Sequence, residues 1–248
     1  ASYDGVITFG DVPIRTVVPQ VVLMHRPGLL DPELTFDHVE DKVAGLMRRL
    51  VSINARFADR VIVQTPWMAE GIASTYPEFK DRITVCRQPA PAAFDSSSRE
   101  KIPKRTQATG LNFLYPAGYY PYKNHSLLAE TSLHEGFSEL VEGLVLTIEE
   151  GQTEFVYGES VSLVGYLPPE RLKKYYRDSD AIVFPSLAES YGLPLIEGMV
   201  SNKAIVAADL PYARDACGEN AIYFDPNSSE SLFDAIVQLN EKLKSGWR

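Results

Sequence analysis

The stretch of the sequence with the clearest chemical content is Phe184 to Gly198, which reads FPSLAESYGLPLIEG. An apolar run opens it and a polar loop follows. Glu189 and Glu197 stand eight residues apart, and Gly192 and Pro194 lie between them, where a helix is expected to start. Backbone N–H groups at a helix start can bind a diphosphate, and glycine lets the backbone approach it closely. Carboxylates would repel such an anion, so their natural partners are neutral hydroxyl groups, such as those of a sugar.

A purely structural interpretation of the same loop stands beside this one. Glutamates eight residues apart occur by chance in a chain of this length. Ser186 and Glu189 also have the spacing of a capping box, in which a serine and a glutamate pair with backbone N–H groups at a helix start. The residues alone leave both interpretations open.

Composition and charge narrow the class of protein. The chain has 248 residues, of which 45% are hydrophobic and 23% charged, which excludes collagen-like, disordered and disulfide-rich scaffolds. A net charge of -9 argues against broad contact with nucleic acid. Cys86 and Cys217 are far apart and form no metal-type cluster, so we expect a reducing compartment. No apolar run reaches the roughly 18 residues of a membrane span, and no signal peptide is evident, so we expect a cytoplasmic protein.

The second half of the chain has the pattern of an α/β domain. Short apolar runs typical of strands buried on both faces alternate with helical patterns. The predicted strands are Asn112–Ala117, Leu144–Ile148, Val161–Tyr166, Ala181–Pro185, Ala204–Ala208 and Ala221–Phe224. Helices are predicted over Glu170–Arg177, after Pro169, and over Ser229–Leu243, with Asn227 as N-cap and Glu230 as its partner. The alternation predicts a doubly wound parallel sheet over residues 110–248.

The first half predicts a second, smaller α/β unit over residues 1–88. Its predicted strands are Gly5–Phe9, Val17–Met24, Val61–Gln64 and Ile83–Cys86. Its predicted helices are Asp41–Phe57 and Pro66–Thr75. These are too few for a complete doubly wound sheet. Residues 89–109 are rich in proline, serine and charge, which is typical of an interdomain linker.

Residues 179–226 resemble the donor-binding half of the retaining glycosyltransferases of family 4, enzymes with the GT-B fold of two Rossmann-like domains. Glu189 and Glu197 match the family's Glu-x7-Glu element. Upstream, VSLVGYLPPERLKKYYRDSDA and LYPAGYYPYKNHSLL match the base-side and phosphate-side elements, and VPQVVLMHRP and ADRVIVQTPWMAEGI resemble late elements of the N-terminal domain. The family's opening strand and glycine-rich loop have no counterpart before Tyr3. We therefore expect an incomplete N-terminal domain, produced by truncation of a longer parent or belonging to an unusually reduced natural member, and we favour truncation.

The resemblance implies a role for each matching residue. Glu197 would bind the ribose hydroxyls of a nucleoside-diphosphate sugar, Glu189 would contact the transferred sugar, and Lys123 would neutralise the departing diphosphate. The other implied contacts are Ser190, Gly118 and Tyr119 in the two loops, the amides of Tyr191, Gly192 and Leu193 at the sugar and diphosphate, Tyr166 and Leu167 by the base, and His25 at the donor sugar. The family usually has arginines where this chain has Tyr119 and Tyr122. His125 is expected on the surface of a first helical turn.

The implied activity is retaining transfer of a sugar from a nucleotide donor to a glycan or lipid-linked acceptor, in cell-surface polysaccharide synthesis. UDP-, GDP- and other donors all stay open, and we expect no cofactor, no metal, and peripheral contact with the inner membrane face. The alternative is a nucleotide-sugar-binding fragment or subunit without transferase activity. Asp178-Ser179-Asp180 matches the motif of metal-dependent transferases, but it precedes a strand. We therefore expect it to end a helix and cap that strand.

Overall fold

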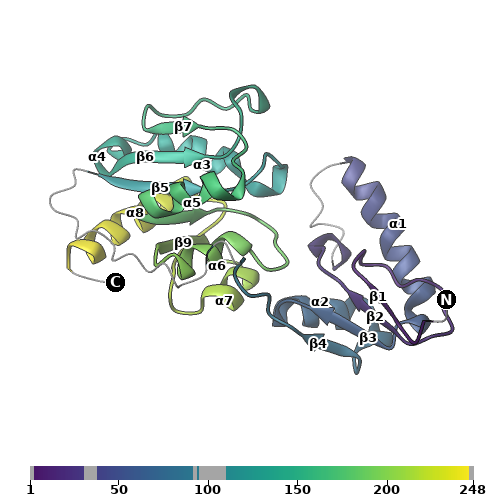
Figure 1. Cartoon of the computed structure of the whole chain (residues 1–248). Coiled ribbons are helices and arrows are strands. Elements are labelled where there is room, and N and C mark those ends of the chain that lie inside the picture. The colour runs from purple at the N-terminus through teal and green to yellow at the C-terminus, as the bar shows by residue number, and fades with distance from the viewer. Residues whose placement is uncertain (1–2, 31–37, 92–93, 95–109, 246–248) are drawn as a thin grey trace. The chain divides into compact units, whose positions relative to one another are not determined.

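The computed structural model describes residues 3–30, 38–91, 94 and 110–245. The chain divides into two compact units, one made of residues 1–88 and 188–191 and the other of residues 89–187 and 192–248. Each unit is built around its own parallel sheet (Figure 1). Most of the predicted linker, residues 92–93 and 95–109, lies outside the described residues.

The first unit contains a four-stranded parallel sheet in the order β1-β2-β3-β4. Its elements are β1 (Val6–Thr8), β2 (Gln20–Leu23), α1 (His38–Asn54), β3 (Arg60–Val63), α2 (Pro66–Thr75) and β4 (Ile83–Val85). Proline at the first position of α2 loses no hydrogen bond there, and the Thr65 hydroxyl accepts from the backbone N–H of Met68 at 3.2 Å. Met68 and Ile72, four residues apart, then lie fully buried in the core beside Val61.

The second unit contains a six-stranded parallel sheet in the order β10-β9-β8-β5-β6-β7, with helices on both faces (Figure 1). Its strands are β5 (Leu111–Tyr115), β6 (Val141–Leu146), β7 (Val161–Leu163), β8 (Ala181–Phe184), β9 (Ala204–Ala208) and β10 (Ile222–Phe224). Its helices are α3 (His125–Ser132), α4 (Phe137–Leu140), α5 (Pro169–Asp178), α6 (Leu193–Val200), α7 (Pro211–Cys217) and α8 (Ser229–Lys244). All four residues of β8 are buried, as expected for an inner strand of a sheet covered on both faces.

The sequence predicted the elements well and some of their ends less well. All ten predicted strands are present among the described residues, with bounds that differ by three residues or fewer. The N-cap of α8 is Ser228, which accepts from the N–H of Ser231 at 3.0 Å, and not Asn227 as predicted. Asn227 instead bonds back to Asp225 in the preceding turn, through its backbone N–H at 2.9 Å. Two helices were not predicted, α4 and α7, because neither is long enough to show a periodic pattern.

Candidate functional site

The strand order of the second unit creates one place where two loops diverge from neighbouring strands. After β5 the chain runs towards β6, and after β8 it runs towards β9 on the other side. Such a switch point at the carboxyl ends of parallel strands is where open α/β sheets bind ligands. The two loops are fastened together, because the N–H of Leu187 donates to the carbonyl of Tyr122 at 2.7 Å and the Asn124 amide donates to the carbonyl of Pro185 at 3.3 Å.

Tyr115, a buried tyrosine at the end of β5, contacts both of these loops. The Tyr115 hydroxyl donates to the carbonyl of Lys123 at 2.7 Å and lies 3.0 Å from the Ser186 hydroxyl. Tyr212 donates to the Ser186 carbonyl, so Ser186 is fully enclosed in the scaffold. The capping-box interpretation of Ser186 and Glu189 is wrong, because α6 begins only at Leu193. The same bonds fix the backbone of Lys123 at the carboxyl edge of the sheet.

The Lys123 side chain crosses two aromatic rings at that edge. Its ammonium group lies 5.1 Å from the centroid of the Tyr122 ring and 5.6 Å from that of Phe184, the last residue of β8. Attraction between a cation and an aromatic face favours this placement. Lys123 ends a short 3-10 turn over Pro121–Lys123, and Asn124 follows it in the left-handed conformation with φ 55°. The turn thus presents one positive charge beside the ends of β5 and β8.

The expectation that His125 lies on the surface is wrong. Its side chain is buried, and desolvation lowers the pKa of the imidazole to about 4. Nε2 lies 3.1 Å from the carbonyl oxygen of Gly118, and because a carbonyl only accepts, Nε2 carries the proton. The ring centroid of Tyr119 lies 5.5 Å from that of His125. His125 is therefore an uncharged prop beneath the Gly118–Tyr119 loop.

The helix after the second loop begins without a side-chain cap. Gly192, the N-cap residue of α6, has φ 73° and no side chain with which to cap the first turn. A β-carbon at Gly198 would lie 2.7 Å from side-chain atoms of Ile182 and Ile205, so glycine allows α6 to lie directly on β8 and β9. This close packing carries Glu197 into the protein, where it is buried. The N–H of Leu195 donates to the carbonyl of Gly192 at 2.9 Å, and the positive end of the helix dipole at this start favours an anionic ligand.

Glu197 is held by a hydrogen bond from a neighbouring helix. The hydroxyl of Tyr176, on α5, donates to Oε2 of Glu197 at 2.7 Å. Burial raises the pKa of the Glu197 carboxyl, and the hydrogen bond from Tyr176 opposes that rise. The sequence analysis did not single out Tyr176, which lies 21 residues before Glu197.

The sequence profile of a known family fits this geometry. The family described as "Glycosyl transferases group 1" matches residues 119–242, half of the chain and most of the second unit. The chain belongs to the group 1 glycosyl transferases. Its two parallel sheets and its structural neighbours confirm the GT-B-type α/β fold that the sequence predicted.

Similarity to known proteins extends over most of the chain. It is 21% identical over 200 residues to the O-antigen chain mannosyltransferase RfbU of Salmonella typhimurium, an alignment that covers 78% of the chain and 54% of RfbU. The chain thus spans about half the length of that relative. HepE of Anabaena, solved in complex with UDP and glucose, superposes with a TM-score of 0.64 at 19% identity over 92% of the chain and 63% of HepE. A glycosyltransferase of Rickettsia africae superposes with a TM-score of 0.67 at 15% identity, over 92% of this chain and 62% of that protein.

The remaining residues predicted for the site divide between two places. Glu189, Ser190 and Tyr191 lie on the loop between β8 and α6, and residues 188–191 group with the first unit by their contacts. Tyr166 and Leu167 follow β7, three strands from β8 in the same sheet. The Tyr166 ring is 79% exposed and Leu167 is buried. An exposed aromatic face at this sheet edge offers a surface on which a planar base can stack.

His25 lies in the first unit, directly after β2, beside a buried carboxylate that the sequence analysis missed. Asp11 has φ 67° and is 1% exposed. Its Oδ1 accepts from the backbone N–H of His25 at 2.6 Å and lies 3.3 Å from Nδ1 of the ring, and its Oδ2 lies 3.2 Å from Nε of Arg26. Asp11 therefore fixes both basic residues at the carboxyl end of β2. Its isolated position in the sequence gave no signal of this role.

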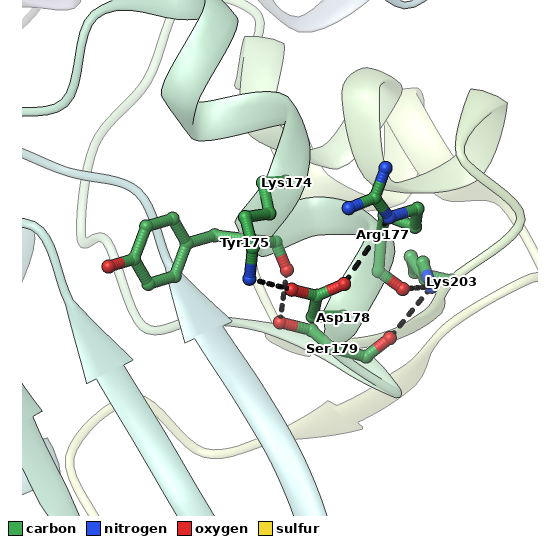
Figure 2. Close-up of polar contacts among 6 residues, drawn as sticks. All are labelled: Lys174, Tyr175, Arg177, Asp178, Ser179 and Lys203. Atoms are coloured by element: carbon green, nitrogen blue, oxygen red, sulfur yellow. Dashed lines mark hydrogen bonds and ion pairs between the residues drawn. The ribbon is translucent and has the colours of Figure 1, made fainter.

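The Asp178-Ser179-Asp180 motif ends α5 as expected, but the carboxylate of Asp180 caps the neighbouring strand β5 and not β8, the strand that follows the motif. Asp178 is the last residue of α5 and pairs with Lys174 and Arg177, and Oδ2 of Asp180 accepts from the N–H of Asn112 at 2.8 Å. Lys203, the residue before β9, also binds the end of α5. Its ammonium group donates to the carbonyls of Arg177 and Ser179, at 2.7 and 2.8 Å, as Figure 2 shows.

The described part of the chain lacks two features, a cluster of metal ligands and a membrane-spanning helix. It holds no group of three or more histidine, cysteine, aspartate or glutamate residues suited to a metal ion. None of its helices is long and apolar enough to cross a membrane.

Proposed function

We propose that the second unit binds a nucleoside-diphosphate sugar and that the protein transfers the sugar, with retention of configuration, to a glycan or lipid-linked acceptor. The observation that carries this proposal is the fastening of the loops after β5 and β8, which sets Lys123 and the uncapped start of α6 at one switch point. One cation and several N–H groups converge there, which suits a diphosphate in a chain of net charge -9. The names of RfbU, an O-antigen chain mannosyltransferase, and of HepE with UDP and glucose support a role in polysaccharide synthesis.

Each residue would have a distinct role in that reaction. Glu197 binds the ribose hydroxyls, and Glu189 binds hydroxyls of the transferred sugar. The remaining contacts are Lys123, Gly118, Tyr119 and the amides of Tyr191, Gly192 and Leu193 at the diphosphate and sugar, Ser190 beside them, Tyr166 and Leu167 at the base, and His25 at the donor sugar.

The electrostatics of the site would act mainly on the leaving group. As the bond from the sugar to the diphosphate breaks, negative charge builds on the departing oxygen. Lys123 and the N-terminus of α6 stabilise that charge, and such fixed groups are the main means available without a metal. Tyr119 and Tyr122 stand where the resembling family usually has arginines, so they supply hydrogen bonds and packing but no charge.

A second candidate is nucleotide-sugar binding without transfer. It is favoured by one observation, that the chain covers 54% of RfbU, so that a whole transferase of that length contains more than this chain. The two candidates differ at Glu189. Replacing Glu189 with alanine abolishes transfer if the chain is a transferase, whereas a binding protein has no transfer to lose.

We also propose that the protein meets an anionic membrane at the inner face through α1. Val43, Leu46, Leu50 and Ile53 recur on one side of this helix, and they are 48%, 59%, 38% and 48% exposed. Exposed Lys42 and Arg49 flank this stripe and suit anionic head groups. The protein should sediment with vesicles that contain phosphatidylglycerol, and Leu46→Asp should abolish this co-sedimentation. Equal sedimentation of the variant would contradict the proposal.

The donor site is tested by titrating the protein with UDP and with GDP by calorimetry, followed by a donor hydrolysis assay with the nucleotide that binds. Lys123→Gln should weaken binding by about tenfold, because it removes one charge-assisted contact to the diphosphate. Lys244→Gln, on the exposed end of α8, is the matched control and should leave the affinity unchanged. Absence of binding to both nucleotides at saturating concentration would refute the donor-site assignment.

A further inference from the structure

The hydrogen bond between Tyr176 and Glu197 joins two helices within the second unit. Tyr176 lies in the last turn of α5 and is 1% exposed, and Glu197 lies in the middle of α6. The Tyr176 hydroxyl lies 2.7 Å from Oε2 of Glu197. It also lies 3.5 Å from the carbonyl oxygen of Pro194, one turn earlier on α6. The phenol therefore meets α6 at the turn that carries the carboxylate.

The Tyr176 hydroxyl is the donor in its hydrogen bond with Glu197. Desolvation raises the pKa of Tyr176 well above its ordinary value, and the negative Glu197 raises it further. The phenol is therefore protonated near neutral pH and donates the hydrogen bond to Glu197. A permanent donor on Oε2 stabilises the ionised carboxylate against the effect of its burial, and an ionised carboxylate accepts hydrogen bonds at both oxygens.

The ring of Tyr176 is itself held by an aromatic side chain from the segment before β5. Phe94 is 8% exposed, and its ring meets that of Tyr176 edge-on, with centroids 4.9 Å apart and planes at 75°. Edge-to-face packing of this kind restricts the orientation of both rings. The direction in which Tyr176 points its hydroxyl is therefore set by Phe94 on one side and by α6 on the other.

From this geometry we infer that Tyr176 is a positioning residue that fixes the carboxylate plane of Glu197 for a pair of ligand hydroxyls, with Phe94 holding the Tyr176 ring. The inference rests on the proposed function, in which Glu197 binds ribose. A vicinal diol presents two O–H donors to a carboxylate, and both bonds form well only if the carboxylate keeps one orientation. Tyr176 supplies that orientation without touching the ligand.

The test compares binding of ribonucleotides and deoxynucleotides. The protein is titrated with UDP or GDP, whichever binds, and with the 2′,3′-dideoxy form of the same nucleotide. Tyr176→Phe keeps the ring on Phe94 and removes only the hydroxyl. We expect it to weaken binding of the ribonucleotide by about tenfold and to leave the dideoxy form nearly unchanged, because only the ribonucleotide uses the oriented carboxylate. Tyr175→Phe, at the neighbouring half-buried position, is the matched control and should change neither affinity.

The outcomes separate the inference from the function on which it rests. If the wild-type protein prefers the ribonucleotide and Tyr176→Phe keeps that preference, or weakens both nucleotides equally, the positioning role is refuted while the donor site stands. If the wild-type protein binds neither nucleotide, the proposed function fails and the ribose role of Glu197 fails with it. Should Tyr176→Phe not fold, Phe94→Leu replaces it, since that variant keeps both hydrogen-bonding partners and loosens only the ring. It should lower the same preference in the same direction.

Discussion

Protonation of His125 should make the protein less stable as the solution becomes acidic. The imidazole titrates at about 4 in the folded protein, because it is desolvated and lies near the charge of Lys123, against about 6.5 in an unfolded chain. The unfolded state therefore binds the proton first as pH falls. The contribution of neutral His125 to stability is complete above the pKa of the unfolded state, and it is lost as the pH falls from that value towards the pKa of the folded state. The whole difference corresponds to about 3 kcal/mol of unfolding free energy.

The measurement is a set of urea unfolding curves at several pH values, with circular dichroism as the signal and a low protein concentration. Between about pH 7.5 and about pH 5, the wild-type protein should lose about 2 kcal/mol more unfolding free energy than His125→Gln, which has no group to protonate. Glutamine keeps an N–H donor for the carbonyl of Gly118. Taking the difference between the two proteins removes the titration of every carboxylate that they share.

A second variant separates this effect from histidine titration in general. His134 is exposed on the surface and stacks on Phe233. His134→Gln should show the same loss on acidification as the wild-type protein. If His125→Gln loses as much stability as the wild-type protein over the same pH range, the imidazole is not buried and neutral, and the account of it as an uncharged prop beneath Gly118 is wrong.

Three further substitutions test the packing and the caps. Gly198→Ala should lower the unfolding free energy by about 1–3 kcal/mol, although alanine favours helices, because its methyl group meets Ile205; a gain in melting temperature would contradict the close approach of α6 to the sheet. Asp11→Ala should lower the unfolding free energy by about 1–3 kcal/mol in urea unfolding, because it leaves the partly buried backbone N–H of His25 without its acceptor. An unchanged unfolding midpoint would show that the contacts of Asp11 with His25 and Arg26 do not stabilise the protein. Lys203→Met should cost about 1–2 kcal/mol by removing two hydrogen bonds at the end of α5, and exchange of α5 amides as slow as in the wild type would refute this.

The sequence was informative wherever one side chain or one short run decides the local structure. The apolar run of β8 is buried on both faces, and Pro169 marks the start of α5, so both elements were predicted nearly to the residue. The six-stranded sheet followed from the alternation of such runs. The strand order, which makes the switch point, needed the structure because it depends on pairing between distant runs.

The errors and omissions have one physical origin, which is contact between residues far apart in the sequence. His125 is the first residue of a helix, a position that is usually solvated, and it is buried because the Tyr115 and Tyr119 rings and the Gly118 carbonyl close over it. Tyr176 is one of two adjacent tyrosines on an amphipathic helix, and only the packing of α5 against α6 shows which of them meets Glu197.

The order in which the strands enter the second sheet couples ligand binding to folding. Along the chain, β5, β6 and β7 come first and pair with one another, and β8 comes later and pairs with the open side of β5. Without β8 in place, the Lys123 turn lacks the loop and helix that follow that strand. A ligand that bridges both loops binds the finished sheet and not its earlier half, so it stabilises the complete pairing by mass action. A nucleotide that occupies this site would therefore act as a folding partner for the last three strands, and amides of β8 would become slower to exchange with solvent when it binds.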